Sequence, residues 1–128
     1  DSRAIREVAT GMHDPTEGGV VTGLVELAAA AGVDAVVDRA AVPVRPETET
    51  VCDALGVDPL RVFGSGALLA AVPADEAAKA RSRLADRGIE AAVIGELTPP
   101  ADPEQGALVL DGERIVDGGR DELYPFWE

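Results

Sequence analysis

The sequence contains one cysteine, one histidine and one lysine among its 128 residues. A single cysteine cannot form an internal disulfide, and no cysteine and histidine have metal-ligand spacing, so a disulfide-rich scaffold and a zinc module are excluded. No apolar run approaches the roughly 20 residues that span a bilayer, and the first residues do not resemble a signal peptide. These absences predict a soluble, cytoplasmic protein with no membrane partner and no metal site.

Basic residues are also scarce: 24 acidic side chains stand against 11 basic ones, which gives a net charge of −13. This charge argues against nucleic acid as a partner, because binding to phosphates needs clustered lysine and arginine. The acids are scattered along the chain rather than gathered in one block. Scattered acid with almost no lysine indicates a surface adapted to high salt, where screening relieves self-repulsion, and hence a halophilic source. An ordinary acidic protein is the alternative.

Apolar residues make up 46% of the chain, which suits a single compact domain at this length. Residue 1 is Asp rather than Met, and Ser2–Val8 has the apolar spacing of a helix that is already under way. We therefore expect residues 1–128 to be one domain of a longer protein.

Three stretches have helical patterns. An apolar stripe beginning at Val20 is wide enough for a buried helix and stops at Gly32. Pro46 opens a second helix through Leu55, and the third has acids in its first turn and arginines in its last. This third predicted helix spans Ala74–Arg87.

Strand signals lie between these helices. Asp111-Gly112 between two apolar runs is typical of a hairpin with a type I′ turn. The other strand candidates are Val33–Val37, Ala67–Val72 (expected to be covered on both faces) and Ile89–Ile94. Loops are expected at Thr10–Gly19 and Pro99–Gly106. Residues 67–97 then form a strand–helix–strand unit, and the predicted fold is mixed α/β, with helices packed on a sheet of about four or more strands.

The run His13-Asp14-Pro15-Thr16-Glu17-Gly18-Gly19 precedes the predicted buried helix. Glycines at a helix entrance let a ligand approach backbone N–H groups, where the helix carries partial positive charge, so a phosphate or carboxylate is the expected ligand. His13 and Asp14 are placed to orient such a ligand, and Thr16 offers a hydroxyl. A tight turn without a ligand explains the same residues.

A second glycine motif, Gly64-Ser65-Gly66, precedes the apolar strand at Ala67. Its glycines permit close approach of the first loop or of a ligand. The turn precedes a strand rather than a helix, so Ser65 is not a nucleophile elbow. The aromatic tail from Tyr124 to Trp127 is expected to pack the terminus onto the domain or a partner, and Cys52 to be a small buried residue.

These motifs carry a family resemblance. The run MHDPTEGGVVTGLVELAAAAG, followed by GSGALLAAVPADEAAKARSRLADRGIEAAVIGELT, resembles the carboxy-terminal domain of the aminoimidazole-ribonucleotide (AIR) synthase (PurM) superfamily, and within it the HypE-type proteins of hydrogenase maturation. The likeness covers roughly residues 1–98. It implies an α/β domain with a four-stranded sheet that is partly ferredoxin-like.

The resemblance also implies partners and ligands. Family members carry an amino-terminal domain, a dimeric β-barrel that supplies most of the ATP and Mg²⁺ site, and they transfer phosphate to an acceptor. The carboxy-terminal domain packs over the nucleotide groove. On this reading the first loop, with His13, Asp14, Thr16, Gly18 and Gly19, faces the phosphates or the acceptor. The second motif, Gly64, Ser65 and Gly66, belongs to the same expected binding site.

Two departures limit what this chain is expected to do. The acid-rich Mg²⁺–ATP motif is absent, so we expect no cofactor in this chain alone and no catalysis without the amino-terminal domain. HypE proteins end in Pro-Arg-Ile-Cys, whose cysteine carries a carbamoyl group, whereas this sequence ends in Tyr-Pro-Phe-Trp-Glu. A non-enzymatic anion-binding or regulatory domain and a plain interaction module are the alternatives, and no catalytic residue is singled out.

Overall fold

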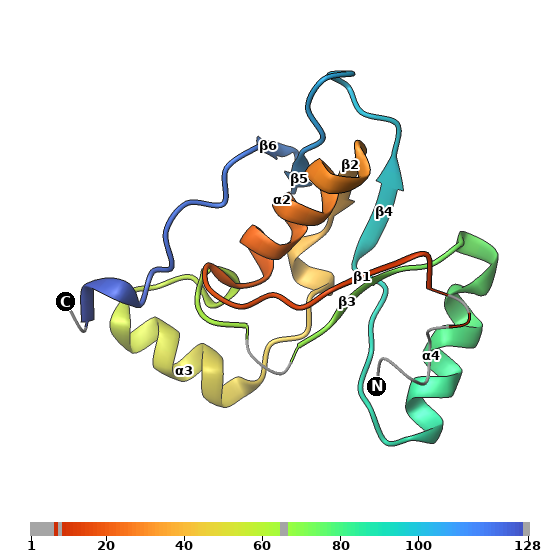
Figure 1. Cartoon of the computed structure of the whole chain (residues 1–128). Coiled ribbons are helices and arrows are strands. Elements are labelled where there is room, and N and C mark those ends of the chain that lie inside the picture. The colour runs from red at the N-terminus through yellow and green to blue at the C-terminus, as the bar shows by residue number, and fades with distance from the viewer. Residues whose placement is uncertain (1–6, 8, 65–66, 127–128) are drawn as a thin grey trace.

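The computed structural model describes residues 7, 9–64 and 67–126. Its centre is a mixed four-stranded sheet in the order β4-β2-β5-β6, with helix α2 lying across one face (Figure 1). Strand β2 is antiparallel to β4 and parallel to β5, and β5 is antiparallel to β6. The predicted mixed α/β fold is confirmed. The bounds are α2 Gly19–Ala31, β2 Asp34–Val37, β4 Gly95–Thr98, β5 Leu108–Leu110 and β6 Glu113–Ile115.

Helix α2 supplies most of the helical side of the core. The helix is buried as expected, but its buried stripe begins at Val21 rather than at Val20, and Ala31 at its end is exposed. The stripe packs on the inward-facing residues of β2 and β5. The helix ends at Gly32, which adopts a left-handed conformation (φ 67°) and closes the last turn through its N–H. The core residues shared by α2 and the sheet are Val21, Leu24, Val25, Ala28, Ala35, Val37, Leu108, Leu110 and Ile115.

The β5–β6 hairpin turns at Asp111 and Gly112, whose φ angles of 50° and 87° are those of a type I′ turn, as predicted. Beside it, the buried carboxylate of Asp34 accepts hydrogen bonds from the backbone N–H groups of Ala101 (3.0 Å) and Ala107 (3.2 Å) and from Arg114 Nη1 (2.9 Å). These hydrogen bonds, of which the one from the Ala101 N–H has the largest effect, lower the pKa of Asp34. They also fix the loop at residues 99–106 to the sheet.

A second, two-stranded sheet pairs β1 (Gly11–His13) with β3 (Leu69–Ala71) in antiparallel register. The prediction that all of Thr10–Gly19 is a loop is therefore wrong for Gly11–His13. These residues have no strand pattern of their own and form a strand because they pair with β3. Strand β3 is also shorter than predicted. Ala70 is exposed, so β3 is not covered on both faces.

Helix α4 (Ala77–Asp86) packs against this smaller sheet through Ala80 and Leu84, which form a separate apolar cluster with Leu68, Val72, Ile89 and Ala91. A 3₁₀ turn at Ala74–Glu76 replaces the first turn of the helix expected at Ala74–Arg87. Figure 1 shows α4 standing apart from the four-stranded sheet. The fold thus has two hydrophobic clusters: a main core between α2 and the four-stranded sheet, and a smaller one beside α4.

The strand predicted at Ile89–Ile94 is wrong: these residues form no strand, and the strand begins directly after them, at β4. A Cβ at Gly95 would overlap the carbonyl oxygen of Val36, so the glycine allows β4 to approach β2 closely. The predicted strand–helix–strand unit is also wrong, because β3 and β4 belong to different sheets.

Helix α3 (Pro46–Leu55) is confirmed, with Gly56 in the left-handed conformation at its end and Cys52 buried beneath it. It leads into a 3₁₀ turn, η2 (Pro59–Arg61), that packs on α2. Of the predicted helix at Ser2–Val8 only Glu7 is described, as a turn.

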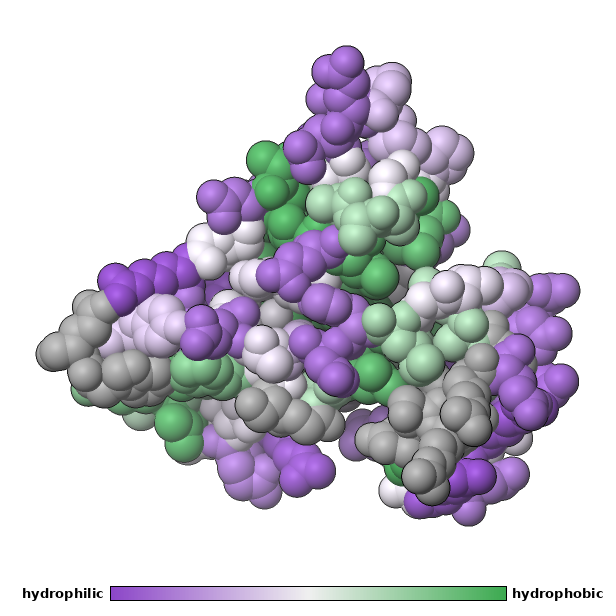
Figure 2. All heavy atoms as spheres, in the orientation of Figure 1, coloured by the Kyte–Doolittle hydropathy of each residue, from purple (hydrophilic) through white to green (hydrophobic). Residues whose placement is uncertain are grey.

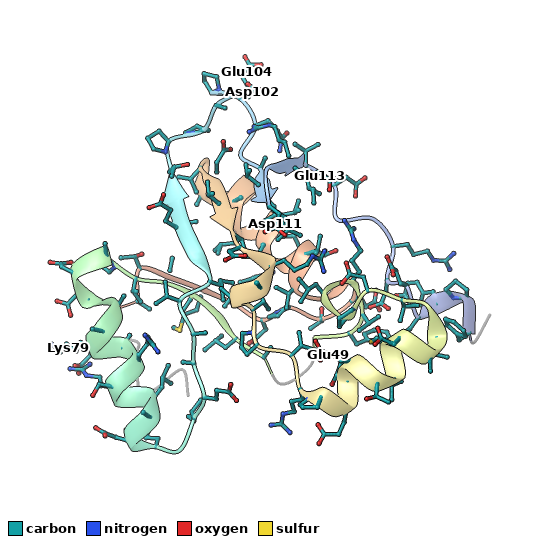
Figure 3. The ribbon with its side chains drawn as sticks, turned by 180° about the vertical axis from the view of Figure 1, so that it is seen from behind. Glu49, Lys79, Asp102, Glu104, Asp111 and Glu113 are labelled. Atoms are coloured by element: carbon teal, nitrogen blue, oxygen red, sulfur yellow. The ribbon has the colours of Figure 1, made fainter. Side chains whose placement is uncertain are left out.

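The surface is strongly polar. Figure 2 shows hydrophilic residues along the margins of one face, with apolar and hydrophilic residues mixed nearer its middle. Figure 3 shows labelled acids in separate places, with Asp102 and Glu104 at the tip of the loop after β4, and Asp111 and Glu113 at the hairpin. Among the described residues no helix has the length and apolar content needed to cross a membrane.

Candidate functional site

The turn before α2, residues 14–18, is held from several directions, and we call it the entry turn. Pro15 is fully buried, and the carbonyl oxygen of Thr16 accepts hydrogen bonds from Gly19 N (3.1 Å) and Gly64 N (3.0 Å). A Cβ at Gly64 would lie 3.0 Å from the carbonyl oxygen of Pro15. The expected close approach of the first loop to the second glycine motif is therefore confirmed at Gly64. Ser65 and Gly66 lie outside the described residues.

The N–H groups of the glycine pair are not open to a ligand. Gly18 N donates to Asp121 Oδ2 at 2.8 Å, and Gly19 N donates to the carbonyl oxygen of Thr16. A Cβ at Gly19 would overlap the carbonyl oxygens of Leu60 and Val62 on η2 and just after it. The interpretation that both amides are free to bind an anion is wrong, because both donate to oxygens of the chain itself. Glycine is needed at these positions because a Cβ would collide with neighbouring atoms.

His13 and Asp14 lie at the side of the entry turn. His13 Nε2 is 2.7 Å from Glu26 Oε2, so the side chain links β1 to the second turn of α2. Asp14 is exposed. Neither of these two residues lines the hollow described next, although Glu26 does.

A hollow of about 540 Å³ lies between the entry turn, α2 and the C-terminal segment, which we define as residues 117–126. Of the six expected site residues that the structure describes, Thr16 and Gly18 line it. Charged groups of both signs surround it, with three carboxylates against one guanidinium: Glu17, Glu26, Asp121 and Arg120. Asp121 is 2% exposed, and Leu123 N also donates to it, at 2.9 Å.

Aromatic rings close one side of the hollow. The rings of Phe63 and Tyr124 meet edge to face, with centroids 6.1 Å apart, and Arg120 Cζ lies 4.9 Å from the Tyr124 centroid. A hydrogen bond to Glu17 raises the pKa of Tyr124. The prediction that the aromatic tail packs the terminus onto the domain is confirmed for Tyr124, whereas Phe126 is exposed and Trp127 lies outside the described residues.

Thr22, in the first turns of α2, completes the inner wall. Its Oγ1 is buried and has no hydrogen-bond partner in the part of the chain that the structure describes. A Cβ at either Gly18 or Gly118 would overlap that oxygen, so two glycines far apart in sequence meet over one threonine. Among the described residues no group of three His, Cys, Asp or Glu side chains is placed to hold a metal ion.

The sequence pointed to the entry turn but missed Thr22, Glu26, Arg120 and Asp121. Gly118-Gly119 ahead of an acid was a weak available signal. A stronger one was the start of α2, which has no acidic residue in its first turn and no side-chain cap. A helix beginning in this way is expected to find its acceptors elsewhere in the fold.

The four-stranded sheet and its buried helix match the class of domain found in solved structures of HypE, a hydrogenase maturation protein. The crystal structure of Escherichia coli HypE matches with a TM-score of 0.78 and 30% identity, over 96% of this chain and 39% of that one. HypE in complex with ATP matches with a TM-score of 0.72 and 28% identity, over 88% and 38%. The HypE–HypF complex matches at 0.72 and 25%, over 84% and 35%.

The family model described as AIR synthase related protein, C-terminal domain, matches residues 2–104, and the chain belongs to this family. The carbamoyl dehydratase HypE of Cupriavidus necator is 42% identical over 117 residues, which are 89% of this chain and 33% of that protein. Its counterpart in Rhizobium leguminosarum is 37% identical over 119 residues, with the same two coverages. The chain spans about a third of the length of these relatives.

Proposed function

We propose that this chain is the carboxy-terminal domain of an ATP-dependent enzyme of the carbamoyl dehydratase type. The observation that carries the proposal is the family membership together with a polar hollow formed at the family motif before α2. An amino-terminal domain then supplies ATP and Mg²⁺, the whole protein is a homodimer, and it works in the cytoplasm. A HypF-like protein is a further partner by analogy with the HypE–HypF complex.

The hollow is proposed to face the acceptor rather than the nucleotide phosphates. Glu17, Glu26 and Asp121 outnumber Arg120, and three neighbouring carboxylates repel a triphosphate. Mg²⁺ does not fit the described residues either, since no group of three potential ligands is gathered. A neutral acceptor that donates hydrogen bonds, such as a carbamoyl NH₂ group, suits this lining.

The chain's own residues then bind and orient the acceptor. The Thr16 hydroxyl and the Glu17 carboxylate are placed on the exposed edge of the hollow, and Tyr124 shares a hydrogen bond with Glu17. His13 acts through Glu26, which it holds at 2.7 Å. Gly19 and Gly64 support the turn through their N–H groups, which donate to the carbonyl oxygen of Thr16, and Asp14 lies exposed within the turn. Orientation of this kind accelerates a reaction by fixing the reacting groups relative to each other.

A chimera tests the proposal. The amino-terminal two thirds of the Cupriavidus necator enzyme is joined to this chain and given ATP, Mg²⁺ and an S-carbamoylcysteine peptide. The peptide thioester loses one water to become a thiocyanate, while ATP becomes ADP and phosphate. Loss of water from the peptide, followed by mass spectrometry and dependent on this chain, is the expected result. Equal activity in the amino-terminal part alone contradicts the proposal.

Point variants locate the acceptor. Thr16→Val is expected to raise the KM for the peptide about ten-fold and to leave the KM for ATP unchanged, because one hydrogen bond to the acceptor is lost. Thr48→Val on the exposed surface of α3 is the matched control. A rise in the KM for ATP with Thr16→Val places the hollow on the phosphate side and contradicts this part of the proposal.

A further inference from the structure

Asp121 is a carboxylate buried at the start of helix α2, whose first turn contains no acidic residue. It is 2% exposed and comes 103 residues after Gly18, to whose N–H it binds. Oδ2 accepts from Gly18 N at 2.8 Å, and Oδ1 accepts from Leu123 N at 2.9 Å. Both oxygens are therefore engaged, one on the entry turn and one on the C-terminal segment.

The C-terminal segment is fixed on its other side as well. Arg61 Nη1 donates to the carbonyl oxygen of Gly118 at 2.9 Å, and Glu122 N donates to that of Arg61 at 3.1 Å. Glu122 Oε1 accepts from Asp58 N at 2.7 Å. The segment therefore bridges η2 and the entry turn, and Asp121 is the side chain that reaches the turn.

The contact leaves little freedom to the turn. Gly18 is left-handed (φ 78°), and neither Gly18 nor Gly118 has room for a Cβ over Thr22. The positive end of the α2 dipole favours a carboxylate at this place, and a charged acceptor strengthens the hydrogen bond from Gly18. Asp121, although distant in sequence, thus accepts a hydrogen bond at the start of the helix, as the side chain of an N-cap residue usually does.

We propose that Asp121 is a positioning residue: it sets the entry turn against the C-terminal segment and so fixes the two walls of the acceptor hollow relative to each other. This inference rests on the proposed function of that hollow. Asp121 acts through Gly18 and the turn and does not itself meet the acceptor.

Asp121→Asn is the informative change, because it keeps the shape and removes one acceptor. An amide oxygen accepts from one of the two N–H groups, and the NH₂ group then faces the other donor. Asp117→Asn is the matched control, since Asp117 is an exposed acid of the same segment that bonds only to Gly119 N (2.9 Å) among the contacts described. Both variants remove one negative charge.

Hydrogen exchange in the full chain gives the first measurement. Asp121→Asn is expected to speed exchange of the Gly18 amide about 10–100-fold while the central α2 amides change much less, and Asp117→Asn is expected to change neither. Equal acceleration of Gly18 and the α2 interior shows a global loss of stability and overturns the proposal. If Asp121→Asn does not fold, the unaltered chain decides: a Gly18 amide exchanging like an unprotected peptide overturns it.

The chimera gives the second measurement. Asp121→Asn is expected to raise the KM for the S-carbamoylcysteine peptide about ten-fold, with the KM for ATP unchanged and with Asp117→Asn unaffected. A fall in kcat alone, or equal effects of both variants, overturns the positioning role. An inactive unaltered chimera instead contradicts the proposed function, while a Gly18-specific effect in hydrogen exchange still establishes the contact, so the two failures are distinguishable.

Discussion

The two glycines at the ends of α2 offer a controlled test of why the entry turn contains a glycine pair. Gly19 and Gly32 have nearly the same backbone angle, φ 69° and 67°, but different surroundings. A Cβ at Gly19 would overlap the carbonyl oxygens of Leu60 and Val62, whereas nothing lies within 4 Å of a Cβ at Gly32. Substitution by alanine therefore imposes the same backbone strain at both positions and a backbone collision at Gly19 alone.

The left-handed conformation costs an alanine about 1–2 kcal/mol, which is the whole expected loss in unfolding free energy for Gly32→Ala. Displacing two backbone carbonyls adds about 1–3 kcal/mol, so Gly19→Ala is expected to lose about 2–5 kcal/mol. Urea unfolding followed by circular dichroism measures both values, with unchanged m-values as the check that the unfolded states are comparable. Equal losses of unfolding free energy for the two variants would refute the explanation by packing and would favour the interpretation that the glycine pair binds a ligand.

Four other outcomes follow from the structure. Leu108→Ala, at a side chain with no exposed surface, is expected to cost about 2–5 kcal/mol in the same urea assay. The pKa of Asp34 is lowered in the folded state, so the ionised side chain stabilises the fold above the ordinary carboxylate pKa, near pH 4. This stabilisation is lost as the pH falls through the pKa that Asp34 has in the folded state. Asp34→Asn is therefore expected to lower the urea midpoint at pH 7 and to lower it much less in acid. Burial raises the pKa of the Cys52 thiol, and the native chain is expected to react with a thiol reagent only at the rate at which it opens. The melting temperature is expected to rise between about 0.1 and 2 M KCl, because salt screens the repulsion of a net charge of −13, and a flat response contradicts adaptation to salt.

The elements that were predicted correctly from the sequence are determined by residues within or directly beside them. Helix α2 has an uninterrupted apolar stripe and a glycine stop, and α3 has a proline at its first position and a glycine just beyond its last. The β5–β6 turn needs two residues with positive φ, and Asp111-Gly112 is a pair that adopts them. Each of these signals lies within a few residues of the structure it determines.

The parts that were missed depend on partners distant in sequence. Strand β1 exists because β3 pairs with it, and β4 starts where Gly95 can pass close to Val36, not where the apolar run lies. The contact from Asp121 to Gly18 crosses 103 residues, and no local pattern connects them. The entry turn was therefore found from its own residues, whereas the wall opposite it was not.

The parallel pairing of β2 with β5 has a consequence for how the polypeptide matures. The N–H of Ala107, directly before β5, donates to the carboxylate of Asp34, at the start of β2 and 73 residues earlier, and β5 lies beside β2 in the middle of the sheet. During synthesis the apolar side of α2 therefore lacks part of its cover until β5, made more than 70 residues after β2, has been added. A ribosome-bound chain halted before β5 is expected to expose that helix to chaperones, and synthesis of the β5–β6 hairpin completes the sheet that covers it.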